Sequence, residues 1–242
     1  AGKAAGELGG EAYTSHADLL ARADLDAVIV APPNFAHHDM TIAAAQAGKH
    51  VFCEKPMALC VADCDEMIAA ARDAGVKLMV GQVLRLIPGF AKAREMVLSG
   101  EFGKPLSISI ERSSYWKPRA WRTDYKTTGG VLYEINAHEI DYMRAILGDA
   151  SSVYACISAA TCPDSDVPGV NYVLVKFRDG GIGMLNSNSL IPQGQYQVAI
   201  TLEKGSIRCD WGSVTFQFRD KEAQKVPRSE ERRVGKECRM PC

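Results

Sequence analysis

The sequence predicts an α/β protein with a parallel sheet near its start and a larger, largely antiparallel open sheet after it. Between residues 26 and 80, three short apolar runs alternate with two helical patterns over short connections. That order is typical of parallel strands joined by right-handed crossover helices. From residue 106 onward, apolar and polar residues alternate in short runs, and turn signals such as Asp179-Gly180-Gly181 separate them, which predicts hairpins.

The composition is that of an ordinary globular protein. The 242 residues are enough for one large domain or two modest ones, and 47% of them are hydrophobic. A net charge of -1 gives no electrostatic case for nucleic acid or for an anionic membrane. No apolar run is long enough to span a bilayer and no C-x-x-C pair occurs, so we expect a cytoplasmic protein without a metal site.

The elements of the first third follow from hydrophobic pattern and from helix stops. Gly48 and Gly75 end two predicted helices, and the strands between them are short and apolar. The chain is expected to begin with the end of a helix at 1–8, a short strand at 12–13 and a helix at 18–22. Strands at 26–31, 51–53 and 76–80 then alternate with helices at 37–46 and 61–74.

The stretch Val51-Phe52-Cys53-Glu54-Lys55-Pro56 predicts a buried strand that stops abruptly. Proline lacks the N–H that a sheet ladder requires, and an X-Pro bond can also be cis. Ligands bind at the carboxyl ends of strands in open parallel sheets, so Lys55 is a candidate ligand-facing ammonium. The alternative is an ordinary Glu-Lys pair on the surface.

Two further strand ends are expected to meet Lys55 at the same edge. Pro33 and Asn34 follow the first strand, and Arg85 follows the third. Asn34 could equally cap the next helix. His37 opens that helix, where a histidine is usually a surface residue, although its ring could reach the crevice.

The remainder begins with a predicted helix at 90–99 and an alternating strand at 106–111. Trp121 and Arg122 follow in an aromatic loop; indole rings often line sugar pockets, although burial in a core is the commoner role. After a helix at 131–147, strands are expected at 153–159, 172–177, 182–187, 197–202, 206–209 and 214–218.

The helix predicted at 131–147 carries Glu134, His138 and Asp141 on one stripe, at i, i+4 and i+7. A carboxylate one turn from His138 would fix its tautomer and raise its basicity, as a general base requires. A solvated helix face with an i,i+4 pair is the plain alternative.

Together the segments APPNFAHH, VFCEKP, GQVLRLIP and GGVLYEINAHEID resemble the Gfo/Idh/MocA oxidoreductases, which are NAD(P)-dependent sugar and polyol dehydrogenases and their relatives. The resemblance implies that Lys55 serves catalysis and substrate, that Glu54 lies on the nicotinamide side, and that His138 is the general base supported by Glu134. It also implies that residues after the first strand and at the edge of the active site contact the cofactor, and that other residues contact the substrate. The cofactor residues are Pro33, Asn34, His37, Glu54, Lys55 and Arg85, and the substrate residues are Lys55, Trp121, Arg122 and His138.

The sequence departs from this family at several positions. Val83 and Asn136 replace a frequent Asn and a frequent Gly, and Glu134 replaces an Asp, which moves the carboxylate by one methylene. No G-x-G-x-x-G follows a strand. We therefore expect residues 1–85 to form an incomplete Rossmann-type NAD(P)-binding domain without its first βαβ unit. Residues 86–228 are expected to form an α+β substrate and oligomerisation domain, and 229–242 a disordered or foreign tail.

The resulting functional hypothesis is a truncated, impaired dehydrogenase that uses NAD or NADP and acts on a secondary alcohol of a sugar or polyol. It is expected to form homo-oligomers through the open sheet. Two alternatives remain at this point: an NAD-dependent glycoside hydrolase of the same family, and a non-catalytic sensor or coregulator that retains the fold.

Overall fold

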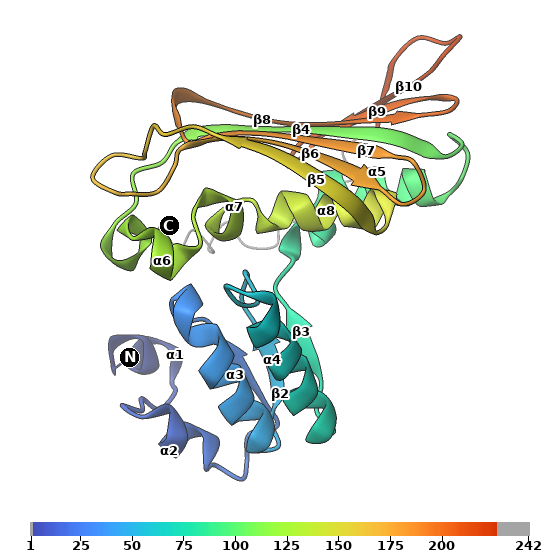
Figure 1. Cartoon of the computed structure of the whole chain (residues 1–242). Helices are drawn as coiled ribbons and strands as arrows, with labels where there is room; N and C mark the ends of the chain where they lie inside the picture. The colour runs from blue at the N-terminus through green and yellow to red at the C-terminus, as the bar shows by residue number, and fades with distance from the viewer. Residues whose placement is uncertain (1, 227–242) are drawn as a thin grey trace.

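A computed structural model describes residues 2–226 of the chain, so the tail expected at 229–242 lies outside the described residues. Figure 1 shows two sheets, one in each half of the molecule, with the helices α6–α8 between the larger sheet and the first half. In the described part of the chain, none of the helices is long and apolar enough to cross a membrane.

The first half contains a three-stranded parallel sheet in the order β1-β2-β3. Buried Val30, Val51 and Cys53 from the strands pack against Ala44 and Met67 from the helices. Its elements are α1 Gly2–Leu8, α2 His16–Leu20, β1 Ala27–Val30, η1 Asn34–Ala36, α3 His37–Gln46, β2 His50–Cys53, α4 Val61–Asp73 and β3 Leu78–Val80. The predicted parallel unit is confirmed.

Local signals explain where these elements end. Helix α4 begins after Cys60, whose sulfur accepts a hydrogen bond from the N–H of Asp63, and it closes before Gly75 at φ 67°, which favours glycine. The strand expected at 12–13 is absent from the described residues. Tyr13 instead donates its hydroxyl to Glu11 and accepts a bond from Arg22, so that the segment is an irregular loop.

The second half is built on an eight-stranded sheet in the order β11-β10-β9-β8-β4-β7-β6-β5. All neighbouring pairs are antiparallel except β4 and β7, which confirms the largely antiparallel open sheet. Its helical elements are η2 Val83–Leu86, α5 Pro88–Leu98, η3 Ala120–Thr123, α6 Tyr125–Thr128, α7 Val131–Glu134 and α8 Ala137–Leu147. Its strands are β4 Pro105–Tyr115, β5 Ala150–Ile157, β6 Val170–Phe177, β7 Ile182–Asn188, β8 Leu190–Leu202, β9 Gly205–Cys209, β10 Val214–Phe218 and β11 Gln224–Lys225.

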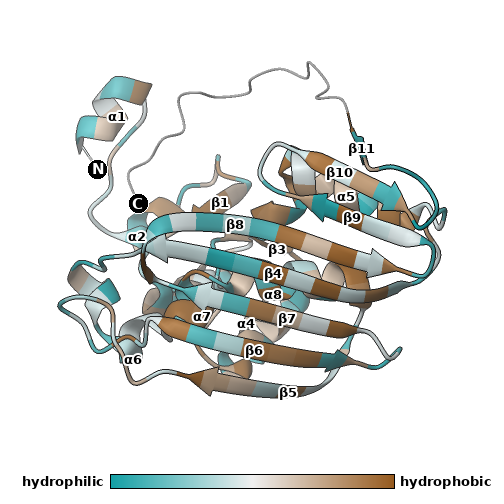
Figure 2. Ribbon diagram, turned by 90° about the horizontal axis from the view of Figure 1, so that it is seen from above, coloured by the Kyte–Doolittle hydropathy of each residue, from teal (hydrophilic) through white to brown (hydrophobic). Residues whose placement is uncertain are grey.

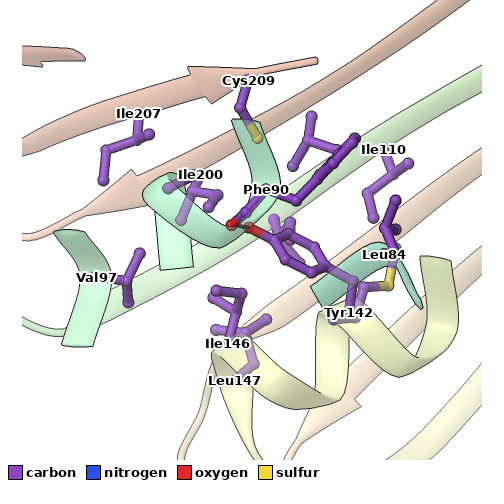
Figure 3. Packing of buried hydrophobic residues seen from close by; sticks show 14 of the residues in the cluster. Leu84, Phe90, Val97, Ile110, Tyr142, Ile146, Leu147, Ile200, Ile207 and Cys209 are labelled. Carbon is purple, nitrogen blue, oxygen red and sulfur yellow. Dashed lines mark hydrogen bonds between the residues drawn. The ribbon is translucent and has the colours of Figure 1, made fainter. Parts of the chain in front are cut away.

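The main core fills the space between this sheet and the helices α5 and α8. Phe90 and Tyr142 pack edge to face, with a centroid separation of 5.5 Å. Figure 3 shows them together with Ile110 and Ile200 of the sheet. The hydroxyl of Tyr142 donates to the carbonyl oxygen of Phe90 at 2.8 Å. This bond satisfies a fully buried phenol and ties α8 to α5.

The prediction of a single helix over 131–147 is wrong. The chain forms two helices, α7 and α8, with a break at Ile135 and Asn136, and Asn136 is the residue that precedes α8. Asparagine side chains compete with the helix backbone for hydrogen bonds. Here the amide of Asn136 bonds to Glu139 and to Ser187 of the sheet, which favours the break.

Gly89 is the tightest position in this packing. A Cβ built there would lie 2.0 Å from the backbone oxygen of Asp210, which cannot move independently of the chain. We therefore expect Gly89→Ala to lower the free energy of unfolding in urea by at least about 2 kcal/mol, because overpacking of a rigid contact is destabilising. The control is Gly6→Ala in exposed α1, where nothing lies within 4 Å. An equal stability for both variants would contradict the packing described here.

The outer face of the large sheet is uncovered among the described residues (Figure 2). Tyr154, Leu174 and Met184 are register partners on adjacent strands, and Tyr172 and Ile182 lie on the same face. All five side chains are exposed. An apolar strip therefore runs over β5–β7 on the side opposite the helices.

Candidate active site

The candidate site lies where the carboxyl ends of the parallel strands meet α7 and α8. Lys55 follows β2, and its peptide bond to Pro56 is cis. The Lys55 ammonium donates to the backbone oxygen of Glu134 in α7, across the boundary between the two sheets. Burial lowers the pKa of Lys55, and the charges of Arg112 and Arg122 act in the same direction, against the opposing effect of the Glu134 carboxylate.

His138 lies in the first turn of α8, within reach of the same charges. Its pKa is lowered to about 4, first by burial and then by the charges of Lys55 and Arg112, so the two cations lie close to the imidazole. The ring nitrogen Nδ1 is buried and has no hydrogen-bond partner among the described residues. A neutral imidazole at pH 7 can accept a proton, which is the chemical requirement for a general base.

Among the described residues, the Glu134 carboxylate forms no hydrogen bond with His138, contrary to the i,i+4 pairing expected from a continuous helix. Its Oε1 accepts a bond from Arg122 Nε at 2.7 Å, and its Oε2 accepts one from Asn34 Nδ2 at 2.8 Å. The break at Ile135 and Asn136 removes the helical register on which the expectation depended. Glu134 therefore holds a guanidinium and an amide in place rather than orienting the imidazole.

Asn34 is buried and forms a link between the two halves of the molecule. Besides the bond to Glu134, its amide donates to the backbone oxygen of Thr128 at 3.2 Å. It does not cap the next helix, since Ala36 is the residue that precedes α3 and no side chain caps that helix. The side chain of Asn34 is thus engaged by protein groups. Pro33, which also follows β1, has no polar side chain to offer a cofactor.

Replacing Asn34 with Ala leaves the Glu134 oxygen and the Thr128 carbonyl without a donor. We expect a loss of about 1–3 kcal/mol in the free energy of unfolding, because buried polar groups are left unsatisfied. The measurement is urea denaturation, with Gln193→Ala as the control, because Gln193 is exposed in β8. A loss no larger than that of the control would show that the link contributes nothing to stability.

His37 is buried, so the usual surface position of a histidine in the first helical turn does not apply. Its Nδ1 lies 2.7 Å from the Pro56 oxygen, and its Nε2 lies 3.0 Å from the Pro32 oxygen. A neutral ring can donate to only one of these two carbonyls. The ring bridges the ends of β1 and β2, and neither of its nitrogens is free for a cofactor.

Arg85 and Glu54 differ in how fully the protein engages them. Arg85 forms a bidentate pair with Asp141 of α8, at 2.6 Å and 2.5 Å, which raises the pKa of Arg85. The carboxylate oxygen Oε2 of Glu54 accepts the N–H of Lys55 at 3.2 Å. Its other oxygen has no bond within residues 2–226, so Glu54 retains an acceptor toward the cleft.

Trp121 and Arg122 belong to η3, and Arg122 lies beside Glu134 of α7. The Arg122 guanidinium stacks over the Trp121 ring at 4.4 Å, and Phe35 of the first half meets the indole edge to face at 6.4 Å. Trp121 is half-buried between the two halves rather than in either core. The structure thus brings Arg122 onto Glu134 and close enough for its charge to act on Lys55, and it places Trp121 beside Arg122.

The sequence analysis missed Arg112 and Glu139. Arg112 continues the buried alternation of Ile108 and Ile110 in β4, and its charge lowers the pKa values of Lys55 and His138. A charged residue at a core-facing strand position was the available signal.

A cavity of about 440 Å³ lies along Tyr133, Ala137 and Ile140, but neither Lys55 nor His138 lines it.

Two family models match the chain. Residues 1–82 match the oxidoreductase family with an NAD-binding Rossmann fold, and residues 90–208 match the GFO/IDH/MocA C-terminal domain. The first match lies on the part of the chain that holds the parallel sheet, and the second match covers most of the larger sheet. The chain belongs to the Gfo/Idh/MocA family, and its first part is of the NAD-binding Rossmann type.

Curated relatives include a 2,7-anhydro-N-acetylneuraminate hydratase of Escherichia coli K12, 32% identical over 77% of this chain and 52% of that protein. A myo-inositol 2-dehydrogenase of Thermotoga maritima is 32% identical over 83% of this chain and 61% of that protein. A levoglucosan dehydrogenase solved with NADH and levoglucosan superposes with a TM-score of 0.86 at 26% identity, covering 93% of this chain and 67% of that one. The chain thus spans about half to two thirds of the length of these relatives.

Proposed function

We propose that this protein is an NAD(P)-dependent oxidoreductase that acts on a secondary alcohol of a sugar or polyol. The observation that carries the proposal is that the buried Lys55 amine reaches from the carboxyl end of β2 to the backbone of α7, where its charge acts on a neutral His138. A base and a cation at one point suit a reaction that removes a hydroxyl proton while negative charge develops on the oxygen. The names of the dehydrogenase relatives support the same substrate class.

In this mechanism His138 accepts the hydroxyl proton of the substrate, and Lys55 donates a hydrogen bond to the developing alkoxide. The bound nicotinamide supplies the hydride acceptor. Arg122, held by Glu134 and by the Trp121 ring, binds substrate oxygens with the N–H groups that the ion pair leaves free. Glu134 thereby acts as a positioning residue for Arg122.

The residues present fit a nicotinamide cofactor in part. Asn34 and His37 are engaged by protein groups, whereas Glu54 offers a free carboxylate oxygen at the end of β2. We assign the free oxygen of Glu54 as the acceptor for the N–H groups of the nicotinamide carboxamide. The backbone at Pro33 and the side chain of Arg85 would then contact the outer part of the dinucleotide. The choice between NAD and NADP is part of the test.

The test is reduction of NAD⁺ or NADP⁺, followed by the absorbance of the reduced nicotinamide, with a panel of cyclic polyols, aldoses and anhydro sugars. We expect turnover with at least one member of the panel and its loss in Lys55→Met. Cofactor binding is measured separately by fluorescence. Binding of cofactor without turnover of any panel member would favour the non-catalytic sensor.

A redox-neutral reaction is the second candidate, because a relative named as a hydratase acts on an anhydro sugar. Transient oxidation could equally serve glycoside cleavage, in which hydride returns to the product. Analysis of products separates these outcomes from net oxidation. Hydration or hydrolysis yields product without accumulation of reduced cofactor, and net oxidation yields both in equal amounts.

We also propose that the protein divides at residues 85–86 into a cofactor domain and a substrate domain.

A further proposal concerns the apolar strip of Tyr154, Tyr172, Leu174, Ile182 and Met184, which we expect a second copy of the protein to cover. Exposed apolar patches of this kind mark interaction surfaces. Sedimentation is expected to show an oligomer that Leu174→Asp dissociates. A monomeric chain at all concentrations would refute the interface.

A further inference from the structure

A row of polar side chains crosses the inner face of the large sheet beneath the break between α7 and α8. Arg112 in β4 is the register partner of Tyr196 in β8 and of Ser187 in β7, and Ser187 is in turn the partner of Asn171 in β6. The rest of this face is apolar core. Polar groups in such a place require partners, and Glu139 of α8 supplies the main one.

Glu139 is fully buried and accepts three hydrogen bonds. Its Oε1 binds Arg112 Nη1 at 2.7 Å and the Tyr196 hydroxyl at 2.8 Å, and its Oε2 binds Asn136 Nδ2 at 3.0 Å. The amide oxygen of Asn136 accepts the Ser187 hydroxyl at 2.7 Å. The first turn of α8 is therefore tied to three strands through one carboxylate and one amide.

His138 lies between these two anchors in the chain. Its own Nδ1 has no partner among the described residues, and Glu134 is bound elsewhere. No side-chain bond to Nδ1 thus orients the imidazole. Its direction depends on the backbone of the first turn of α8, which Asn136 and Glu139 hold.

We propose that Glu139 is a positioning residue that, through Asn136 and Arg112, fixes the first turn of α8 and so sets His138 opposite Lys55. This inference rests on the proposed role of His138 as the base. It concerns a buried carboxylate to which the resemblance assigned no role, although Glu139 follows His138 directly in the segment GGVLYEINAHEID. The Arg112 guanidinium stacks on the Tyr196 ring at 5.5 Å, which holds it in the same arrangement.

The charged groups around His138 make the effect measurable. Lys55 of the first half and Arg112 of β4 are the cations whose charges act on the imidazole, and Glu139 balances Arg112. When Glu139 becomes Gln, Arg112 keeps its charge without a carboxylate. When Asn136 becomes Gly, the ion pair remains and only the tie between the helix start and the sheet is lost.

The experiment is an NMR titration of His138 in the full chain, combined with amide hydrogen exchange. The chain has five histidines, and His138→Gln assigns the resonance. We expect Glu139→Gln to move the pKa of His138 further down by more than about 0.5 unit, because an uncompensated cation disfavours the imidazolium. In Asn136→Gly, exchange at residues 137–140 is expected to accelerate at least about tenfold relative to the core of β4.

Arg144→Gln is the matched control, because it removes an exposed ion pair to Asp149 from the same helix. Asn136→Gly retains the buried ion pair and so carries the test if Glu139→Gln does not fold. An unchanged His138 pKa together with uniform acceleration of exchange across the sheet would reduce Glu139 to a structural role and overturn the proposal. Neither measurement requires turnover, so a failure of the proposed reaction is recognised separately, by the cofactor assay.

Discussion

Replacing His138 with Gln is expected to lower the rate of hydride transfer by about 10²–10⁴-fold, the usual contribution of a positioned general base. Glutamine keeps the size of the side chain but cannot accept a proton at neutral pH. The loss should fall on kcat, with little change in KM, because proton transfer takes place in the transition state. The measurement is steady-state reduction of the nicotinamide with the best substrate of the panel.

Lys55→Met is the companion variant, and it should cost about 10²–10³-fold through loss of the cation that faces the developing alkoxide. The control is His16→Gln, since His16 is exposed in α2 and remote from the cleft. If His138→Gln retained the activity of the control, the base would have to be another group, and the proposed mechanism would be wrong.

Acidification is expected to destabilise the protein through His138. The pKa of His138 is about 4 in the folded chain, against an ordinary value of 6.5, so the unfolded chain binds more protons between these two values. Stability therefore falls as the pH falls through this window, by up to about 1.4 kcal/mol per unit and about 3 kcal/mol in total, and it levels off below the folded pKa.

This prediction is checked by urea denaturation of the native chain and of His138→Gln at several pH values between 7 and 4. The variant has no proton to take up at this position, so its stability should fall less steeply. The raised pKa of His38, which is paired with Asp39 and Glu66, acts in the opposite direction. That contribution is common to both proteins and cancels in the comparison. Parallel curves would mean that His138 titrates normally in the folded state.

The sequence was sufficient for the parallel unit because its signals are local. Gly75 ends a helix, and Pro56 prevents a strand from continuing, whatever the rest of the chain does. Lys55 could therefore be assigned to the carboxyl end of β2 before any distance was known. The alternation in β4 and the hairpin at Asp179 likewise predicted the antiparallel sheet.

The partners of Glu134 could not be predicted in the same way. Its i,i+4 spacing to His138 holds only in a continuous helix, and the break at Asn136 depends on Ser187, 51 residues further along the chain. The bond of Glu134 to Asn34 spans 100 residues. Such choices depend on which donors the tertiary structure brings together, and spacing along the chain does not encode them.

The carbonyl of Glu134 has a consequence for how Lys55 can act. An ammonium carries three N–H groups, and the backbone oxygen takes one of them, which leaves two with directions set by the protein. An incoming hydroxyl thus meets a donor that is already aimed. Little reorganisation remains as charge builds on the oxygen, so the selectivity of the cleft would favour the alkoxide over the neutral alcohol.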